Sequence, residues 1–122
     1  DKRRQQAGKS QVMNIIGDVK NKDCIIVDDI IDSGGTIVNA VEALKKKGAL
    51  DVYLFITHDV LSWDAINKIK KSKIKKLIIT DTINNSSKIK NNNKIEDLSI
   101  DQLMAEAIKR ISNSTSVSDL FN

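Results

Sequence analysis

The residues best suited to chemistry form one short string in the first third of the chain. Two adjacent carboxylates, Asp28 and Asp29, are followed by Asp32, Ser33, Gly34, Gly35 and Thr36. Twin glycines permit unusual backbone dihedrals and let a ligand approach the backbone closely. If a helix begins at this point, its free amides and its dipole favour an anion. The two hydroxyl groups would add donors, so the string predicts a phosphate cradle.

The paired acids Asp28 and Asp29 need a different explanation, because carboxylates beside a phosphate would repel it. Sugar hydroxyls require acceptors, and magnesium prefers oxygen ligands. The combination therefore predicts a sugar phosphate with Mg²⁺ nearby. It is not a Walker loop, since no Gly-x-x-x-x-Gly-Lys-Ser/Thr pattern occurs. A strand end with solvated acids and a glycine turn is the alternative, which the combined string 25–36 disfavours.

Apolar runs and turn residues predict the elements that hold this string in place. Residues 23–32 form an apolar run closed by acids, as expected of a buried parallel strand. The helix that follows runs to the lysines before Gly48, which is expected to cap it. Further strands are expected at 51–57, 76–80 and 95–98, and a surface loop at 84–94. Further helices are expected at 62–70, where Ser62 can act as the cap, and at 100–111.

This alternation of strands and helices predicts an α/β fold. We expect one domain with a mainly parallel sheet, right-handed crossovers and helices on both faces. Ligands bind such sheets at the carboxyl ends of the strands. The string at 28–36 lies at the end of the first strand.

Composition argues against several classes of partner. The net charge is +4, with a basic run at 68–76, but aromatic residues make up only 3% of the chain. Bases would find few stacking platforms, so a solvated face is expected there and no nucleic acid. No apolar run approaches the ~20 residues that a membrane span needs, so no membrane partner is expected. The single Cys24 cannot form an internal disulfide, which favours a cytoplasmic location.

The string 25–36 resembles the phosphoribosyl diphosphate motif of the type I phosphoribosyltransferase fold. Further stretches along nearly the whole chain resemble the ribose-phosphate pyrophosphokinase family, in the same order: 1–4, 12–19, 57–58, 80–83, 103–108 and 116–121. The match corresponds to the carboxyl-terminal part of those enzymes. The resemblance therefore implies that an amino-terminal half is absent from this chain.

The resemblance implies an activity and roles for individual residues. The enzymes transfer the β,γ-diphosphoryl group of ATP to the C1 hydroxyl of ribose 5-phosphate, with Mg²⁺. Residues 32–36 would hold the 5-phosphate, while Asp28 and Asp29 would face the ribose hydroxyls and metal-bound water. Lys2 and Arg4 would act in a flexible basic catalytic loop at 1–14, ahead of a domain at 15–122. No metal ligand is assigned within the chain.

Further roles are expected for residues in the tail and at the ends of two strands. By resemblance, Ser116, Ser118 and Phe121 would bind a regulatory nucleotide or phosphate at the subunit contacts of a homo-oligomer. His58, at the end of a strand, is either a general base or a structural residue. Asp81 and Thr82 also end a strand, where they either approach the rim of the site or serve the fold.

Three functions remain open at this stage. The chain is expected to supply the ribose 5-phosphate site of a diphosphokinase and to be inactive alone. A phosphoribosyltransferase is an alternative, although no base-binding hood is evident in 122 residues. A non-catalytic regulatory relative is the other. The chain departs from the family pattern in having no proline and in placing Trp63 where a small residue is usual.

Overall fold

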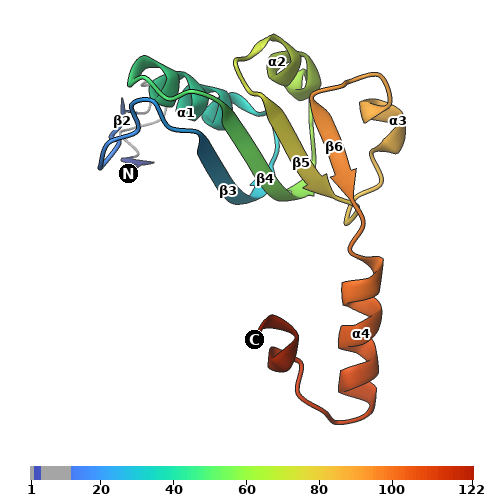
Figure 1. Cartoon of the computed structure of the whole chain (residues 1–122). Helices are drawn as coiled ribbons and strands as arrows, with labels where there is room; N and C mark the ends of the chain where they lie inside the picture. The colour runs from blue at the N-terminus through green and yellow to red at the C-terminus, as the bar shows by residue number, and fades with distance from the viewer. Residues whose placement is uncertain (1, 4–11) are drawn as a thin grey trace.

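A four-stranded parallel sheet forms the centre of the molecule (Figure 1). The computed structural model describes residues 2–3 and 12–122, with side chains from residue 14 onward. The strands lie in the order of the sequence: β3 (Cys24–Ile31), β4 (Val52–Asp59), β5 (Lys76–Thr80) and β6 (Ile95–Leu98). The expected strands are confirmed, and the α/β class with them.

Helix α1 (Gly35–Lys46) begins directly after the glycine turn that follows β3. It ends at Lys46, and Gly48 caps it as predicted, with a left-handed φ of 89°. The amide of Gly48 donates to Lys45 O at 3.0 Å, and the amide of Ala49 donates to Leu44 O at 3.1 Å. This pair of bonds is the Schellman motif, which satisfies carbonyls left open at the end of a helix.

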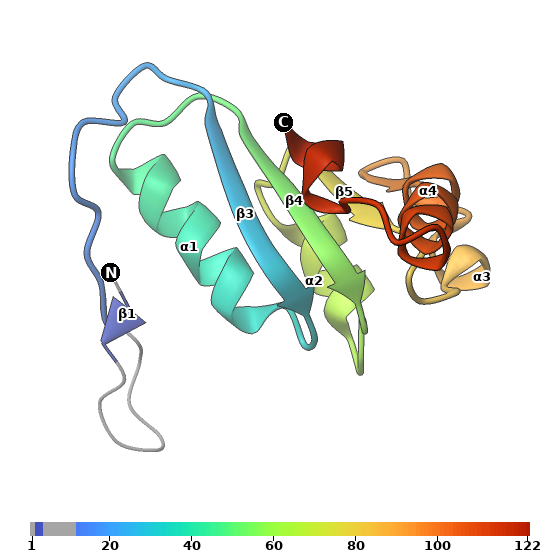
Figure 2. The same ribbon diagram turned by 90° about the horizontal axis from the view of Figure 1, so that it is seen from below.

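Helix α2 (Ala65–Lys71) packs beside α1 on one face of the sheet (Figure 1). The strand order explains why both helices share that face. When consecutive strands are added in one direction through right-handed crossovers, every connecting helix falls on the same side. The expected parallel sheet is present, but in the described part of the chain no helix covers β3 and β4 on the other side (Figure 2).

The core lies between the sheet and these two helices. Alternate residues of each strand point into it, as the twofold strand period requires. Val52, Leu54 and Leu77 are fully buried there. The opposite face exposes apolar side chains: Ile25 is 63% exposed, Val27 77% and Phe55 43%. We call Ile25, Val27 and Phe55 the open face.

The segment 84–94 is not the plain surface loop that its Asn-rich composition predicts. It contains a short helix, α3 (Ser86–Ile89), and it buries Asn85 and Asn92. The side-chain amide of Asn85 donates to the carbonyl and, at 3.0 Å, to the carboxylate of Asp59, which is fully buried at the end of β4. Polar composition misled the prediction because Asn85 finds acceptors inside the protein and Asn92 Oδ1 accepts from the Lys94 amide at 3.0 Å.

Helix α4 (Asp101–Ser112) confirms the expected helix, but it projects away from the sheet (Figure 1). Its apolar stripe is largely exposed, with Ile108 at 61% and Ile111 at 68%. The tail ends in a short 3₁₀ helix, η1 (Ser118–Phe121).

At the other end of the chain, β1 (Lys2–Arg3) pairs antiparallel with β2 (Val12–Met13). No helix in the described residues is long and apolar enough to cross a membrane.

Candidate functional site

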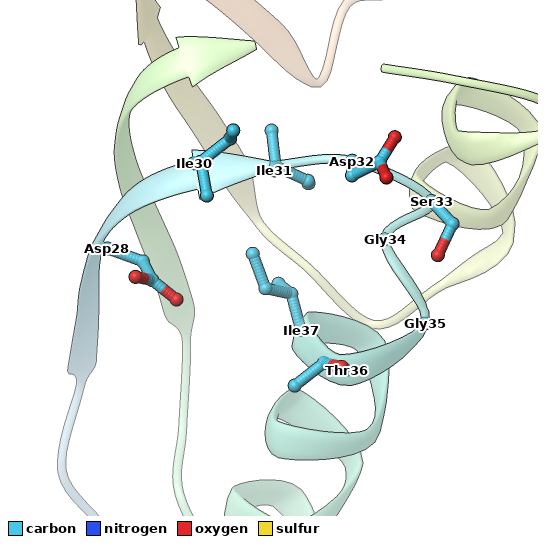
Figure 3. A pocket seen from close by; sticks show the side chains of 9 residues that line it. All are labelled: Asp28, Ile30, Ile31, Asp32, Ser33, Gly34, Gly35, Thr36 and Ile37. Atoms are coloured by element: carbon cyan, nitrogen blue, oxygen red, sulfur yellow. The ribbon is translucent and has the colours of Figure 1, made fainter. Parts of the chain in front are cut away.

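A pocket of about 310 Å³ opens where β3 turns into α1 (Figure 3). The five residues 32–36 line it together with Asp28, Ile30, Ile31 and Ile37. A cavity of this size suits a small ligand. The predicted cradle residues are thus brought together at the carboxyl end of a parallel strand, where such sheets bind ligands. Whether they hold a sugar phosphate stays a prediction.

The backbone of this turn offers unpaired donors. Gly34 precedes α1 in a left-handed conformation, with φ of 76°. The first backbone bond of the helix runs from the amide of Val38 to Gly34 O at 3.0 Å. The backbone amides of residues 33–37 donate no hydrogen bond to any of the described residues. An anion at the helix start would satisfy these groups and meet the positive end of the dipole.

Of the two paired acids, only Asp28 lines the pocket. Asp28 lines it and points to the same side of β3 as Ile37 and Thr36 (Figure 3). Asp29 is exposed and does not line it. Successive side chains of a strand point to opposite faces, so Asp29 shares the side of the open face. Its expected contact with a ribose hydroxyl would need a ligand that reaches around the strand end.

The residues that support the loop come from beyond β4, and one of them overturns an expectation. Ser62 does not cap α2, which starts at Ala65 and has no side-chain cap. Its hydroxyl instead donates to the carboxylate of Asp32. Lys68 of α2 donates from Nζ to Ser33 O at 3.3 Å. The predicted cradle contains no lysine, and folding brings Lys68 to its rim. No spacing signal links residues thirty-five positions apart.

The polar residues at the ends of β4 and β5 form hydrogen bonds with one another or with neighbouring groups of the fold. His58 Nδ1 lies 2.9 Å from Thr82 Oγ1, and that hydroxyl donates to Thr57 O at 3.1 Å. Asp81 accepts hydrogen bonds from the Ser99 hydroxyl and from the Ile100 amide. These two bonds, the Ser99 bond first, hold the pKa of Asp81 below its ordinary value. None of these side chains lines the pocket after β3.

The remaining predicted residues lie far along the chain from the pocket. Lys2 falls in β1, where only the backbone is described, and Arg4 lies outside the described residues. In the tail, Ser116 Oγ lies 2.9 Å from Ser118 Oγ, while the Arg110 guanidinium donates to Ser116 O at 2.9 Å. Phe121 is 72% exposed. The catalytic and regulatory roles of these residues stay predictions.

Magnesium would need oxygen ligands beyond those of one carboxylate. The described residues contain no group of three or more His, Cys, Asp or Glu side chains that could hold a metal. Magnesium commonly keeps several waters and binds through one or two carboxylates plus substrate phosphates. Asp28 in the pocket would suit that arrangement by accepting hydrogen bonds from metal-bound water.

The parallel sheet and the glycine turn opening a helix at a strand end define an α/β domain of the type I phosphoribosyltransferase kind. Comparison with known families agrees. The family model of the phosphoribosyl synthetase-associated domain matches residues 4–122, and the chain belongs to that family.

Individual relatives extend the comparison. Proteins named ribose-phosphate pyrophosphokinase from Agrobacterium fabrum and Brucella melitensis are 51% and 52% identical to this chain over its whole length. The crystal structure of phosphoribosylpyrophosphate synthetase from Mycobacterium smegmatis matches 81% of the chain with a TM-score of 0.75 and 38% identity. The chain spans 39% of the length of the two curated relatives and 33% of the crystallised one.

Proposed function

We propose that the protein containing this chain is a ribose-phosphate diphosphokinase, and that this chain supplies its ribose 5-phosphate site. The observation that most directly supports this proposal is the pocket after β3, which is lined by residues 32–36. Its loop amides have no acceptor among the described residues. The names of the relatives support the same reaction. The diphosphoryl group of ATP would move to the C1 hydroxyl of ribose 5-phosphate, releasing AMP.

The roles of the residues follow from what each can offer. The amides of residues 33–37 and the hydroxyls of Ser33 and Thr36 would bind the 5-phosphate. Asp28 would accept hydrogen bonds from ribose hydroxyls and orient water on Mg²⁺, and Asp29 would do so from the strand end. The metal, when bound, neutralises charge that develops on the migrating group. Lys2 and Arg4 would add cations for the same purpose.

Further parts of the proposal concern the whole protein. Ser116, Ser118 and Phe121 would bind a regulatory nucleotide or phosphate at contacts between subunits of a homo-oligomer. The two hydroxyls form a hydrogen bond with each other at 2.9 Å, so they lie close enough to contact one anionic group together. We place the protein in the cytoplasm, with no nucleic-acid or membrane partner.

The test separates binding from turnover. Ribose 5-phosphate and ATP are titrated separately into the whole protein by calorimetry, and AMP release is then measured with both present. We expect sugar-phosphate binding and release of AMP that requires ribose 5-phosphate. The 122-residue chain alone should bind the sugar phosphate weakly and release no AMP.

Other outcomes would favour the alternatives. If neither ligand bound the whole protein, a regulatory relative would be the better assignment. If phosphoribosyl diphosphate were consumed in the presence of a nucleobase, the protein would be a phosphoribosyltransferase. Substantial AMP release by the chain alone would contradict its assignment as a partial site.

A further inference from the structure

Three successive carbonyl groups at the turn between β3 and α1, those of Ile31, Asp32 and Ser33, are held from one side. Ile31 O accepts from the amide of Leu61 at 3.2 Å, and Asp32 O accepts from the amide of Ser62 at 3.2 Å. Ser33 O accepts from Lys68 Nζ at 3.3 Å. These three donors belong to one segment, residues 61–68, which we call the backing segment.

The orientation of the carbonyls fixes that of the amides. A trans peptide is planar, so the C=O of one residue and the N–H of the next point in opposite directions. No cis peptide occurs in the described residues. Holding three successive carbonyls toward the backing segment therefore turns the amides of Asp32, Ser33 and Gly34 away from it. Gly34 O is in turn held by Val38, which directs the Gly35 amide out of the helix start.

Successive amides aimed into one concavity form a nest, which binds anions through the backbone. Such a nest needs fixed peptide planes, because each carbonyl that turned inward would present a negative dipole to the phosphate. Ser62 adds a second constraint, since its hydroxyl binds the Asp32 carboxylate and restrains that charge. In Figure 3 this carboxylate points away from Thr36.

We infer that Lys68 and Ser62 are positioning residues for the sugar phosphate. Acting through the peptide planes of residues 32–34, they aim the loop amides at the 5-phosphate. The inference rests on the proposed function and deepens it. Lys68 has a second effect of the same sign, because its ammonium places a positive charge beside a loop whose own side chains carry only negative charges, on Asp28 and Asp32.

Neighbouring lysines on α2 provide a matched control. Lys70 is exposed on the same helix, and two residues of helix turn it about 200° from Lys68. Lys70→Met therefore removes the same charge from α2 without touching Ser33. Lys68→Met removes the donor to Ser33 and keeps most of the side-chain length, while Lys68→Arg restores a cationic donor.

The experiment compares these variants in the whole protein. Binding of ribose 5-phosphate is measured by calorimetry, and the ¹⁵N–¹H signal of Gly34 is followed with and without ligand. We expect Lys68→Met to weaken binding about fivefold and to move the Gly34 amide signal before ligand is added. Lys68→Arg and Lys70→Met should stay within about twofold of wild type. Ser62→Ala should weaken binding in the same direction as Lys68→Met.

Three results would overturn the inference, each for a different reason. If wild-type protein binds ribose 5-phosphate and Lys68→Met binds it equally well with an unmoved Gly34 signal, the inference is wrong and the proposed function stands. If wild-type protein binds no ribose 5-phosphate, the proposed function fails and the inference falls with it. A loss shared by Lys70→Met would assign the effect to net charge and overturn the positioning role.

Discussion

At the scale of single residues, the two glycines of the loop have different reasons to be glycine. Gly34 has φ of 76°, a region that side chains disfavour. Gly35 has an ordinary backbone, and a Cβ built there would meet only Ser33 Oγ at 4.0 Å. The protein's own packing therefore does not require glycine at 35. If a requirement exists, it comes from the ligand.

This contrast yields a prediction for Gly35→Ala. Alanine favours a helix more than glycine does, so the free energy of unfolding should rise by about 0.5 kcal/mol or stay unchanged. Binding of ribose 5-phosphate should nevertheless weaken about tenfold, because the methyl group would lie where the backbone meets the phosphate. Denaturant unfolding and calorimetry on the same sample measure the two effects. Undiminished affinity would show that the phosphate does not approach Gly35.

A second residue, Asp81, predicts a pH dependence. Its pKa is lowered from 3.8 by the Ser99 hydroxyl and the Ile100 amide. Because the folded pKa lies below the unfolded one, the stabilisation is fully present above 3.8 and is lost as pH falls through the folded pKa. A carboxyl ¹³C titration should give a pKa below 3.8 in wild type and a higher one in Ser99→Ala.

Ser112 offers the control for that titration. Ser112→Ala removes an exposed hydroxyl from the end of α4 and should leave the Asp81 pKa where wild type has it. An unchanged value in Ser99→Ala would show that the hydroxyl does not stabilise the Asp81 carboxylate.

At the scale of elements, β4 and the segment before α3 are joined by one buried polar pair. The Asn85 amide donates to the carbonyl and the carboxylate of Asp59, whose side chain is fully buried. The other carboxylate oxygen, Oδ1, has no partner in the described residues. Buried polar groups destabilise a protein unless they are paired, so this contact is needed where the two elements meet.

Asn85→Ala should therefore destabilise the fold by about 2–3 kcal/mol, since it leaves a buried carboxylate with fewer donors. Asn93→Ala, at an exposed position of the same segment, should change the free energy of unfolding by less than about 0.5 kcal/mol. Chemical denaturation followed by circular dichroism compares the two variants. Equal midpoints would mean that the Asp59–Asn85 contact contributes nothing to stability.

At the scale of the whole molecule, the sheet is covered on one side only in the described residues. The open face exposes Ile25, Val27 and Phe55 together, and α4 exposes an apolar stripe beyond the sheet edge. Contiguous apolar surface of this kind is typical of contact surfaces between proteins or domains. The 122-residue chain taken alone should therefore self-associate and bind a hydrophobic dye.

Val27→Lys tests that expectation, because Val27 is 77% exposed and its loss removes little core packing. The variant should bind less dye and sediment as a smaller species than the unmodified chain. Ile16→Lys is the control, since Ile16 is 88% exposed but lies outside the sheet. A chain that sediments as a monomer without binding dye would show that the open face does not drive self-association.

The sequence by itself determined the four strands of the sheet, the longer helices and the glycine turn before α1. Apolar runs of the right length predicted all four strands of the sheet, and glycines at their ends predicted the turn before α1 and the cap after it. Such signals are local, because strand period, helix dipole and left-handed turns depend on residues close together in the chain. The family resemblance rested on the same local strings.

Only the tertiary structure decided which residues from distant elements meet. Strand order placed α1 and α2 on one face, which the alternation of elements could not reveal. Folding separated Asp28 from Asp29 across the strand, turned Ser62 from an expected cap into a partner of Asp32, and brought Lys68 to Ser33 O. Those contacts depend on how helices and strands pack in space, and the spacing of residues along the chain carries no record of that packing.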